Sequence, residues 1–382
     1  LTLWDLVNPA ADDVRGRDLA ANIASFEKAH PDVTVEVNTL PWANIDPQLM
    51  QAANAGNSPD VVRLLAWDLP KHVAAGNVLP LDEYFDGDRD DWLLGWDTLT
   101  SDGKKWAIPY EYRSPALYYR TDFTGDVPPA TWDEMVQQAK AAPERPGVVL
   151  GLSSASQASA LAEVFVSYLW DAGGEVFAKD GTAAFASPEG VATFERLGGM
   201  VKDGIAPKEI VGYTYEEVFQ SITAGASDFW LLGSHRYETA VTTAGLEGKL
   251  ALAPLPGDSG SAPAHVFGWT LAMGKDSKNQ DLAAELIQHL TSAEAQLNRV
   301  KATGELPTRA SVYQDAWFTT DDAATARMLS DWFAESGRTP AYGEHWVELS
   351  QIWAEALQSM VLEGVSAKKA AQTAADAYDA LL

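Results

Sequence analysis

The chain has 382 residues, of which 46% are hydrophobic and 21% charged, and it contains no cysteine. This composition is typical of a folded protein of about two or three domains, and it excludes disordered and fibrous classes, disulfides and thiolate metal sites. Acidic residues outnumber basic ones by 54 to 27, and the net charge of -27 argues against nucleic acid or an anionic lipid surface as a partner.

The first part of the chain alternates between strand and helix patterns. "LTLWD" at 1–5 alternates apolar and polar residues, and Leu19, Ile23 and Phe26 then recur at helical spacing until Pro31 ends the helix. A second strand is expected at 33–37, a second helix at 46–55, and a buried strand in "PDVVRLLA" at 59–66. Together they predict an open α/β sheet covered by helices.

Helix starts are easy to find in the middle and at the end of the chain. Thr131, Thr214 and Thr291 each precede a Glu by three residues, which is the spacing of a capping box. Ser187 before Pro188 also has the pattern of a helix start. A flexible connector is expected at 254–263, and "HVFGWTLAM" at 265–273 predicts a strand in which Gly268 permits a close approach to the backbone.

Motifs for catalysis and metal binding are missing from the sequence. There is no HExxH, GxSxG, GxGxxG after a strand or GxxxxGK[ST], and the six histidines show no paired ligand spacing. The stretch "DGDRDDWLLGWD" places Asp86, Asp88 and Asp90 as in a calcium loop, but Asp91 stands where the loop needs Gly and Asp97 where it needs Glu. We expect a solvated acidic loop there, with no metal and no cofactor.

Aromatic residues cluster where strands appear to give way to loops. Trp4, Trp42, Trp67, the "PYEYR" segment at 109–113, "FWLLGSHRYE" at 229–238 and Trp269 all occupy such places. In an open α/β sheet, these strand ends face the ligand crevice, and a flat ring beside Asp, Glu or Arg suits a sugar. For Trp269 two interpretations stay open, a core aromatic or a ring that lines a cleft.

Four segments, in the same order, resemble the extracellular solute-binding proteins of sugar ABC transporters, of the maltose and trehalose type. They are "SPDVVRLLAWDLPKHVAAGNVLPLDEY", "KWAIPYEYRSPALYYRTDF", "PPATWDEMVQQAK" and "VFGWTLAMGKDSKNQDLAAELIQHLTSAEAQ". The resemblance implies a two-lobed periplasmic-binding-protein-like fold of type II, with a ligand cleft between lobes joined by hinge crossings. It places 1–111 and 265–312 in the N-terminal lobe, and 112–264 and 313–382 in the C-terminal lobe.

The resemblance also nominates ligand-binding residues by position. Where several relatives have a stacking Trp in the turn near 230, this chain has His235, and Trp230 is the substitute if the turn is shifted. The other candidates are Trp67, Asp68, Glu111, Arg113, Gly233, Ser234, Arg236, Gly268, Trp269, Arg338 and, less firmly, Trp346.

The expected function is capture of a neutral di- or oligosaccharide and its delivery to the permease subunits of an ABC transporter, without catalysis. A glycoside hydrolase with an aromatic cleft is the alternative, because its two carboxyl groups cannot be seen in a sequence. The resemblance further implies a monomer outside the cytoplasmic membrane, in the periplasm or at the cell surface, and anchored by a lipidated cysteine ahead of the mature domain.

Overall fold

The computed structural model describes residues 1–85, 89–93, 96–155, 159–225 and 227–382. These form two compact units, one of residues 1–113, 266–330 and 341–344, the other of residues 114–265, 331–340 and 345–382. The lobes expected from the sequence put 313–330 in the second lobe, whereas the structure packs this segment with the first unit. The segment begins within the short helix at Ala310–Gln314, which lies against α11 (Ala293–Thr303).

The first unit is built on a six-stranded sheet in the order β2-β1-β3-β12-β4, with β7 paired to β12. Its helices α1, α10 and α11 contact one another, while α2 lies against β1 and β3. The elements are β1 (Thr2–Asp5), α1 (Val14–Ala29), β2 (Glu36–Thr39), α2 (Trp42–Ala55), β3 (Val61–Leu65), α3 (Leu69–Ala74), β4 (Val78–Leu79), β5 (Thr100–Ser101), β6 (Lys104–Lys105), β7 (Ile108–Arg113), β12 (Phe267–Gly274), α10 (Gln280–Leu290) and α11.

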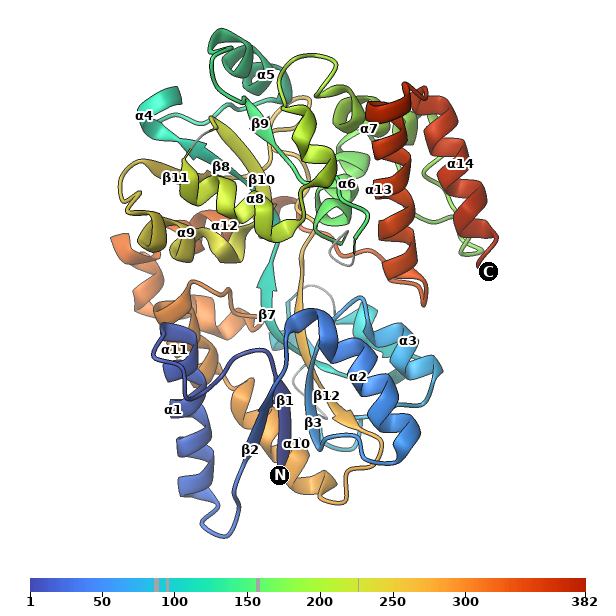
Figure 1. Ribbon diagram of the computed structural model, residues 1–382. Helices are drawn as coiled ribbons and strands as arrows, with labels where there is room; N and C mark the ends of the chain where they lie inside the picture. Colours follow the sequence, from blue (N-terminus) through green and yellow to red (C-terminus); the bar gives the residue numbers. More distant parts are fainter. Residues whose placement is uncertain (86–88, 94–95, 156–158, 226) are drawn as a thin grey trace. The chain divides into compact units, whose positions relative to one another are not determined.

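The connections of β1, β2 and β3 create a switch point in this sheet. The three strands are parallel, and the chain moves from β1 to β2 in one direction and from β2 to β3 in the other. Figure 1 shows α1 and α2 on the two sides of β1, β2 and β3, which is the arrangement that right-handed crossovers produce. Ligands of open α/β sheets bind at the carboxyl ends of strands where the order reverses, here between β1 and β3.

The expected strand around Gly268 is β12, and the structure explains its glycine. β12 pairs antiparallel with β3 on one side and β7 on the other, and the pairing with β7 shifts register between Trp269 and Thr270. A Cβ atom on Gly268 would lie 1.8 Å from the backbone oxygen of Glu111 in β7. The close approach expected at Gly268 is therefore made by the neighbouring strand.

We expect Gly268→Ala to destabilise the protein by about 3 kcal/mol, because the added methyl group forces β7 and β12 apart. Urea denaturation measures the change. Gly212→Ala is the matched control, since a Cβ there meets no atom within 4 Å. Equal midpoints for the two variants would contradict the expectation.

The second unit contains a four-stranded sheet in the order β11-β8-β10-β9. β8 is antiparallel to β10 and to β11, and β10 is parallel to β9. The elements are β8 (Pro115–Arg120), α4 (Thr121–Thr124), α5 (Trp132–Ala141), β9 (Val148–Val149), α6 (Ser159–Asp171), α7 (Pro188–Gly199), α8 (Tyr215–Ala224), β10 (Phe229–Gly233), α9 (Tyr237–Ala244), β11 (Leu250–Ala253), α13 (Trp346–Glu363) and α14 (Ala367–Asp379); α12 (Ala324–Ser336) begins in the first unit and ends in the second.

The predicted helix starts agree with the structure at three of four places. Thr214 and Glu217 form the full capping box of α8, and Ser187 and Thr131 cap α7 and α5. At the fourth place the cap of α11 is Ser292, one residue after the predicted Thr291, because the Thr291 hydroxyl instead donates to the Ile287 carbonyl of α10.

Two sequence features stand apart from these units. None of the helices in the described ranges is long and apolar enough to cross a membrane. Of the calcium-like stretch, Asp86 and Asp88 lie outside the described residues, and Asp91 binds Arg309 at 2.9 Å. The described residues hold no group of three His, Asp or Glu side chains placed to bind a metal ion.

Candidate functional site

Strand ends of the first unit bring predicted site residues to one edge of its sheet. β1 and β3 run in parallel, so Asp5 at the end of β1 and Trp67 just after β3 lie at the same edge. β12 is antiparallel to β3 and β7 is antiparallel to β12, so the end of β7 pairs there with the start of β12, Arg113 opposite Phe267. This edge is the switch point, and it is the candidate site of the first unit.

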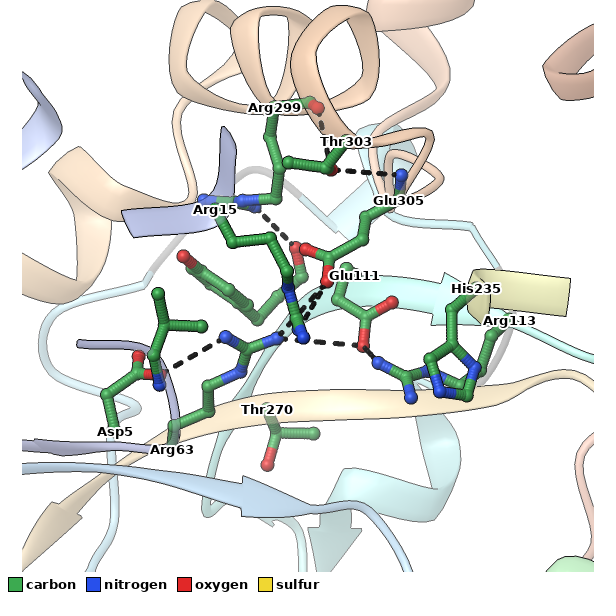
Figure 2. A network of polar contacts seen from close by, with 12 residues as sticks. Asp5, Arg15, Arg63, Glu111, Arg113, His235, Thr270, Arg299, Thr303 and Glu305 are labelled. Atoms are coloured by element: carbon green, nitrogen blue, oxygen red, sulfur yellow. Dashed lines mark hydrogen bonds and ion pairs between the residues drawn. The ribbon is translucent and has the colours of Figure 1, made fainter. Parts of the chain in front are cut away.

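A buried network of arginines and carboxylates lies behind this edge. Figure 2 shows Arg63 of β3 at its centre, and its side chain is only 2% exposed. Its guanidinium nitrogens lie 3.3 Å from Asp5 Oδ1, 3.9 Å from Glu111 Oε1 and 3.9 Å from Glu305 Oε1. We call the whole set the Arg63 network: Asp5, Arg15, Asp18, Arg63, Glu111, Arg113, Arg299 and Glu305.

The Arg63 network joins segments that are far apart in the sequence. Arg15 Nη2 donates to Glu305 Oε1 at 2.6 Å, and Arg299 Nε lies 3.7 Å from Asp18 Oδ2. Arg113 Nη2 donates to Glu111 Oε1. With four arginines and four carboxylates, the network is electrically balanced.

Two aromatic rings pack against Arg63. Its guanidinium carbon lies 4.5 Å from the ring centre of Tyr110 and 5.2 Å from that of Trp269, which is 4% exposed. These distances are those of cation–π contacts. Trp269 is therefore nearly buried beside the network, which agrees with the core interpretation more closely than with an open ring in a cleft.

Three predicted site residues of the first unit nevertheless hold polar atoms without partners. Within the described part of the chain, Glu111 Oε2, Arg113 Nε and Trp269 Nε1 are buried and make no hydrogen bond. A buried polar atom without a partner costs about 1–3 kcal/mol, and a hydrogen bond to a bound ligand would remove this cost. All three lie on β7 and β12.

The neighbouring arginines stabilise the ionised form of Glu305. Burial by itself raises the pKa of Glu305, but Arg15, Arg63, Arg113 and Arg299 outweigh it and lower the pKa to about 2 from 4.5. Burial likewise lowers the pKa of Arg63, and Asp5 with Glu305 raises it above the ordinary value. Glu305 and Arg63 therefore face each other as an ionised pair in the neutral pH range.

The lowered pKa of Glu305 predicts a specific loss of stability in acid. Because the pKa is lower in the folded than in the unfolded state, the stabilisation is complete above pH 4.5 and is lost as the pH falls toward 2. The loss is on the order of 3 kcal/mol. Urea midpoints between pH 7 and 2 measure it for the protein and for Glu305→Gln, which lacks this part of the slope. The exposed Glu36→Gln is the control, and an unchanged slope in Glu305→Gln would contradict the assignment.

Trp67 and Asp68 follow β3 at the same edge. The Trp67 ring lies 5.0 Å from the ring of Phe267 and 6.3 Å from that of Tyr342, with ring centres as the reference. Trp67 is 5% and Asp68 7% exposed, and Asp68 precedes α3 without capping it through its side chain. The structure therefore brings Trp67, Glu111, Arg113, Gly268 and Trp269 together in one unit.

A second group of predicted residues lies at an edge of the second unit's sheet. Gly233 ends β10 opposite Pro115 of β8, and the backbone N–H of Ser234 donates to the Ser114 carbonyl at 2.8 Å. His235 stacks on Tyr215 with ring centres 5.9 Å apart. Arg236 binds Glu216 through two nitrogens at 3.2 and 3.1 Å.

Two predicted aromatic site residues are core residues in the structure. Trp230 is 0% exposed and its indole donates to Ser221 Oγ at 2.9 Å, so it has no free face for stacking. Trp346 is 1% exposed and packs against Trp353 at the start of α13. Both rings fill the interior of the second unit because they sit on the buried faces of a strand and a helix.

Arg338 is a predicted residue that stays accessible. Its side chain is 46% exposed and binds Glu175 at 2.7 Å. The guanidinium carbon lies 4.5 Å from the ring centre of Trp170, another residue of the second unit.

Sequence reasoning missed the centre of the network. Arg63 interrupts the apolar run "VVRLLA", and a charged residue inside a buried strand is a signal that could have revealed it. Arg15 and Glu305 carry no such signal, because they meet Arg63 only through the tertiary fold.

A comparison with models of protein families identifies the family of this chain. The model of the bacterial extracellular solute-binding protein family matches residues 10–297. The chain belongs to this family. Its members bind solutes and are not enzymes. This chain is therefore a solute-binding protein.

Similar proteins agree with this assignment. The diacetylchitobiose binding protein DasA of Streptomyces coelicolor is 26% identical, over 81% of this chain and 73% of its own length. The galactooligosaccharide-binding protein of Bacillus subtilis is 25% identical, over 98% of this chain and 88% of its own. The maltose-bound structure of T. maritima MalE3 has a TM-score of 0.83 at 24% identity, covering 100% and 99% of the two chains. The structural likeness confirms the predicted fold class.

Proposed function

We propose that this solute-binding protein captures a neutral di- or oligosaccharide for import by an ABC transporter. Two relatives whose names give oligosaccharides as ligands support the class of ligand. The glycoside hydrolase alternative finds no support in the comparisons, since the matching family is one of binding proteins.

The observation that carries the proposal is the set of unpartnered atoms at the edge of the first unit. Glu111 Oε2 accepts, and Arg113 Nε and Trp269 Nε1 donate, so together they complement a hydroxyl-rich rim. A sugar hydroxyl both donates and accepts, and it satisfies either kind of atom. A ring with an apolar C–H face also suits the neighbouring aromatic side chains.

Charge balance in the Arg63 network supports a neutral ligand. Each of its arginines is matched by a carboxylate. A ligand with net charge would bring one unpaired charge beside buried groups, which is strongly unfavourable. An uncharged ligand leaves the balance intact.

Binding is assigned in this proposal to Trp67, Asp68, Glu111, Arg113 and Trp269 of the first unit, and to Gly233, Ser234, His235, Arg236 and Arg338 of the second. Gly268 supports the site through strand pairing. The predicted cleft and the hinge motion between lobes stay predictions, as do the lobe boundaries.

The family consists of extracellular proteins, and the proposed location and partners of this chain follow from that. We expect a monomer that works in the periplasm or at the cell surface, anchored through a lipidated cysteine. The permease subunits of an ABC transporter are the expected receiving partner.

A thermal-shift screen over neutral oligosaccharides tests the proposed function. A bound sugar at about 100 times its Kd adds roughly 2.7 kcal/mol of stability, and the melting temperature rises with it. The same mixtures are assayed for newly formed reducing ends, and we expect none. Release of reducing ends would favour the hydrolase instead.

A further inference from the structure

A groove of about 610 Å³ runs beside α2 in the first unit. It shares no residue with the Arg63 network or with the residues nominated for ligand binding, although it includes Trp4, one of the aromatic residues predicted to lie at strand ends. Its lining consists of two alanines together with Trp4, Asn44, Pro47, Gln48, Gln51 and Asn57. Its size is within the range of small-molecule sites, which is about 300–1,000 Å³.

The sequence of α2 builds one wall of this groove. Ile45, Leu49 and Ala53 recur every four residues and are buried toward the sheet. Asn44 and Gln48 are also four residues apart, and Gln51 follows three residues later, so these amides share another side of the helix. From Asn44 to the lining alanine at 55, α2 rises about 16 Å, which gives the groove an elongated wall.

Trp4 of β1 supplies an aromatic surface to the groove. Along β1 the side chains alternate, so that Leu3 and Asp5 are buried and Trp4 is half-buried. The ring offers a flat apolar face next to the amides of α2. Pro47 has no backbone N–H, so it cannot give the Ala43 carbonyl its helical hydrogen bond.

The chemistry of the lining selects a class of ligand. No lining residue is ionisable, although 21% of the chain is charged. An ionic ligand would find no counter-charge here, and a purely apolar one would strip the amides of water without replacing it. Among the described residues, the side chains of Asn44, Gln48, Gln51 and Asn57 make no hydrogen bond to the protein.

We propose that this groove is a second carbohydrate site, which binds an extended neutral oligosaccharide along α2. Each amide both donates and accepts hydrogen bonds, as a row of hydroxyl groups requires, and Trp4 stacks on the apolar face of one sugar ring. The groove is open to solvent, so its affinity is lower than that of the proposed capture site.

Fluorine NMR of fluorotryptophan-labelled protein tests the second site. The Trp4 resonance is assigned with Trp4→Phe and followed during titration with maltohexaose, cellohexaose, xylohexaose and chitohexaose, and with oligogalacturonate as the anionic comparison. We expect at least one neutral sugar to shift the Trp4 resonance in a saturable way, and oligogalacturonate to leave it in place. The double variant Gln48→Glu with Gln51→Glu should weaken this response at least about tenfold.

Gln220→Glu is the matched control, because Gln220 is an exposed helical glutamine in the second unit. It should keep the full Trp4 response, and melting temperatures confirm that all variants are folded. An unmoved Trp4 resonance with every neutral sugar, an equal shift with oligogalacturonate, or an unaltered response in the double variant would overturn the proposal. The Trp269 resonance, assigned with Trp269→Phe, is followed in the same titrations. If it stays in place while the Trp4 resonance shifts, the proposed capture site fails and the second site stands, so the two failures are distinguishable.

Discussion

Replacing Arg63 by Met should destabilise the first unit by about 3–5 kcal/mol. Arg63 is 2% exposed and lies between Asp5, Glu111 and Glu305, so its loss leaves buried carboxylates without their shared cation. The new side chain fills part of the volume but neutralises no charge. Urea denaturation at neutral pH measures the change in the free energy of unfolding.

Arg17→Met is the control for this prediction. Arg17 also pairs with an aspartate, but its side chain is 59% exposed and that of Asp12 is 99% exposed. Water solvates both groups, so the midpoint should hardly move. Arg63→Lys keeps the charge but lacks the planar guanidinium group. Its urea midpoint should therefore fall between those of Arg63→Met and Arg17→Met. A midpoint for Arg63→Met equal to that of Arg17→Met would show that the network does not stabilise the fold.

Trp269→Ala should destabilise the protein by about 3–5 kcal/mol, because the ring is 4% exposed and packs against Arg63. This variant reports on packing. Trp269→Phe isolates the indole N–H, since it keeps an aromatic ring and removes Nε1. If Nε1 donates to the bound sugar, Trp269→Phe should weaken sugar binding about tenfold with a much smaller loss of stability.

Calorimetry with the sugar found in the thermal-shift screen measures the affinity of each variant. Trp132→Phe in the second unit serves as a control for the same chemical change at a half-buried indole. An unchanged Kd in Trp269→Phe would assign Trp269 to the core alone, and the family assignment would stand.

Local sequence signals predicted the elements that build the site. Alternation in "LTLWD", the stripe of Leu19, Ile23 and Phe26, and the apolar run after Pro59 led to β1, α1 and β3 with the correct order. The second strand was expected at 33–37 and lies at Glu36–Thr39, because an edge strand with mostly exposed residues has a weak hydrophobic pattern.

The site itself was predictable only in part. Position relative to strand ends predicted Trp67, Glu111 and Arg113 at one edge of the sheet, and they lie there because topology places such ends together. Position relative to a strand end does not predict how deeply a ring is buried, because burial depends on contacts from distant segments. The family resemblance nominated Trp230 and Trp346 without information on burial, and the structure shows both inside the second unit.

Gly268 illustrates the same limit. The sequence indicated a close approach to the backbone there, and the structure confirms one. Which partner makes the approach follows from the pairing of β7 with β12, across more than 150 residues of chain, and no local pattern contains it.

The central claim is that this solute-binding protein binds a neutral oligosaccharide. Calorimetric titration of the purified protein tests it most directly, with neutral oligosaccharides, a sugar acid, amino acids and short peptides as titrants. The account predicts saturable heat with one molar equivalent of a neutral oligosaccharide at the capture site, without added metal or cofactor. Tight binding of a peptide or an amino acid, with no heat from any neutral sugar, would contradict it.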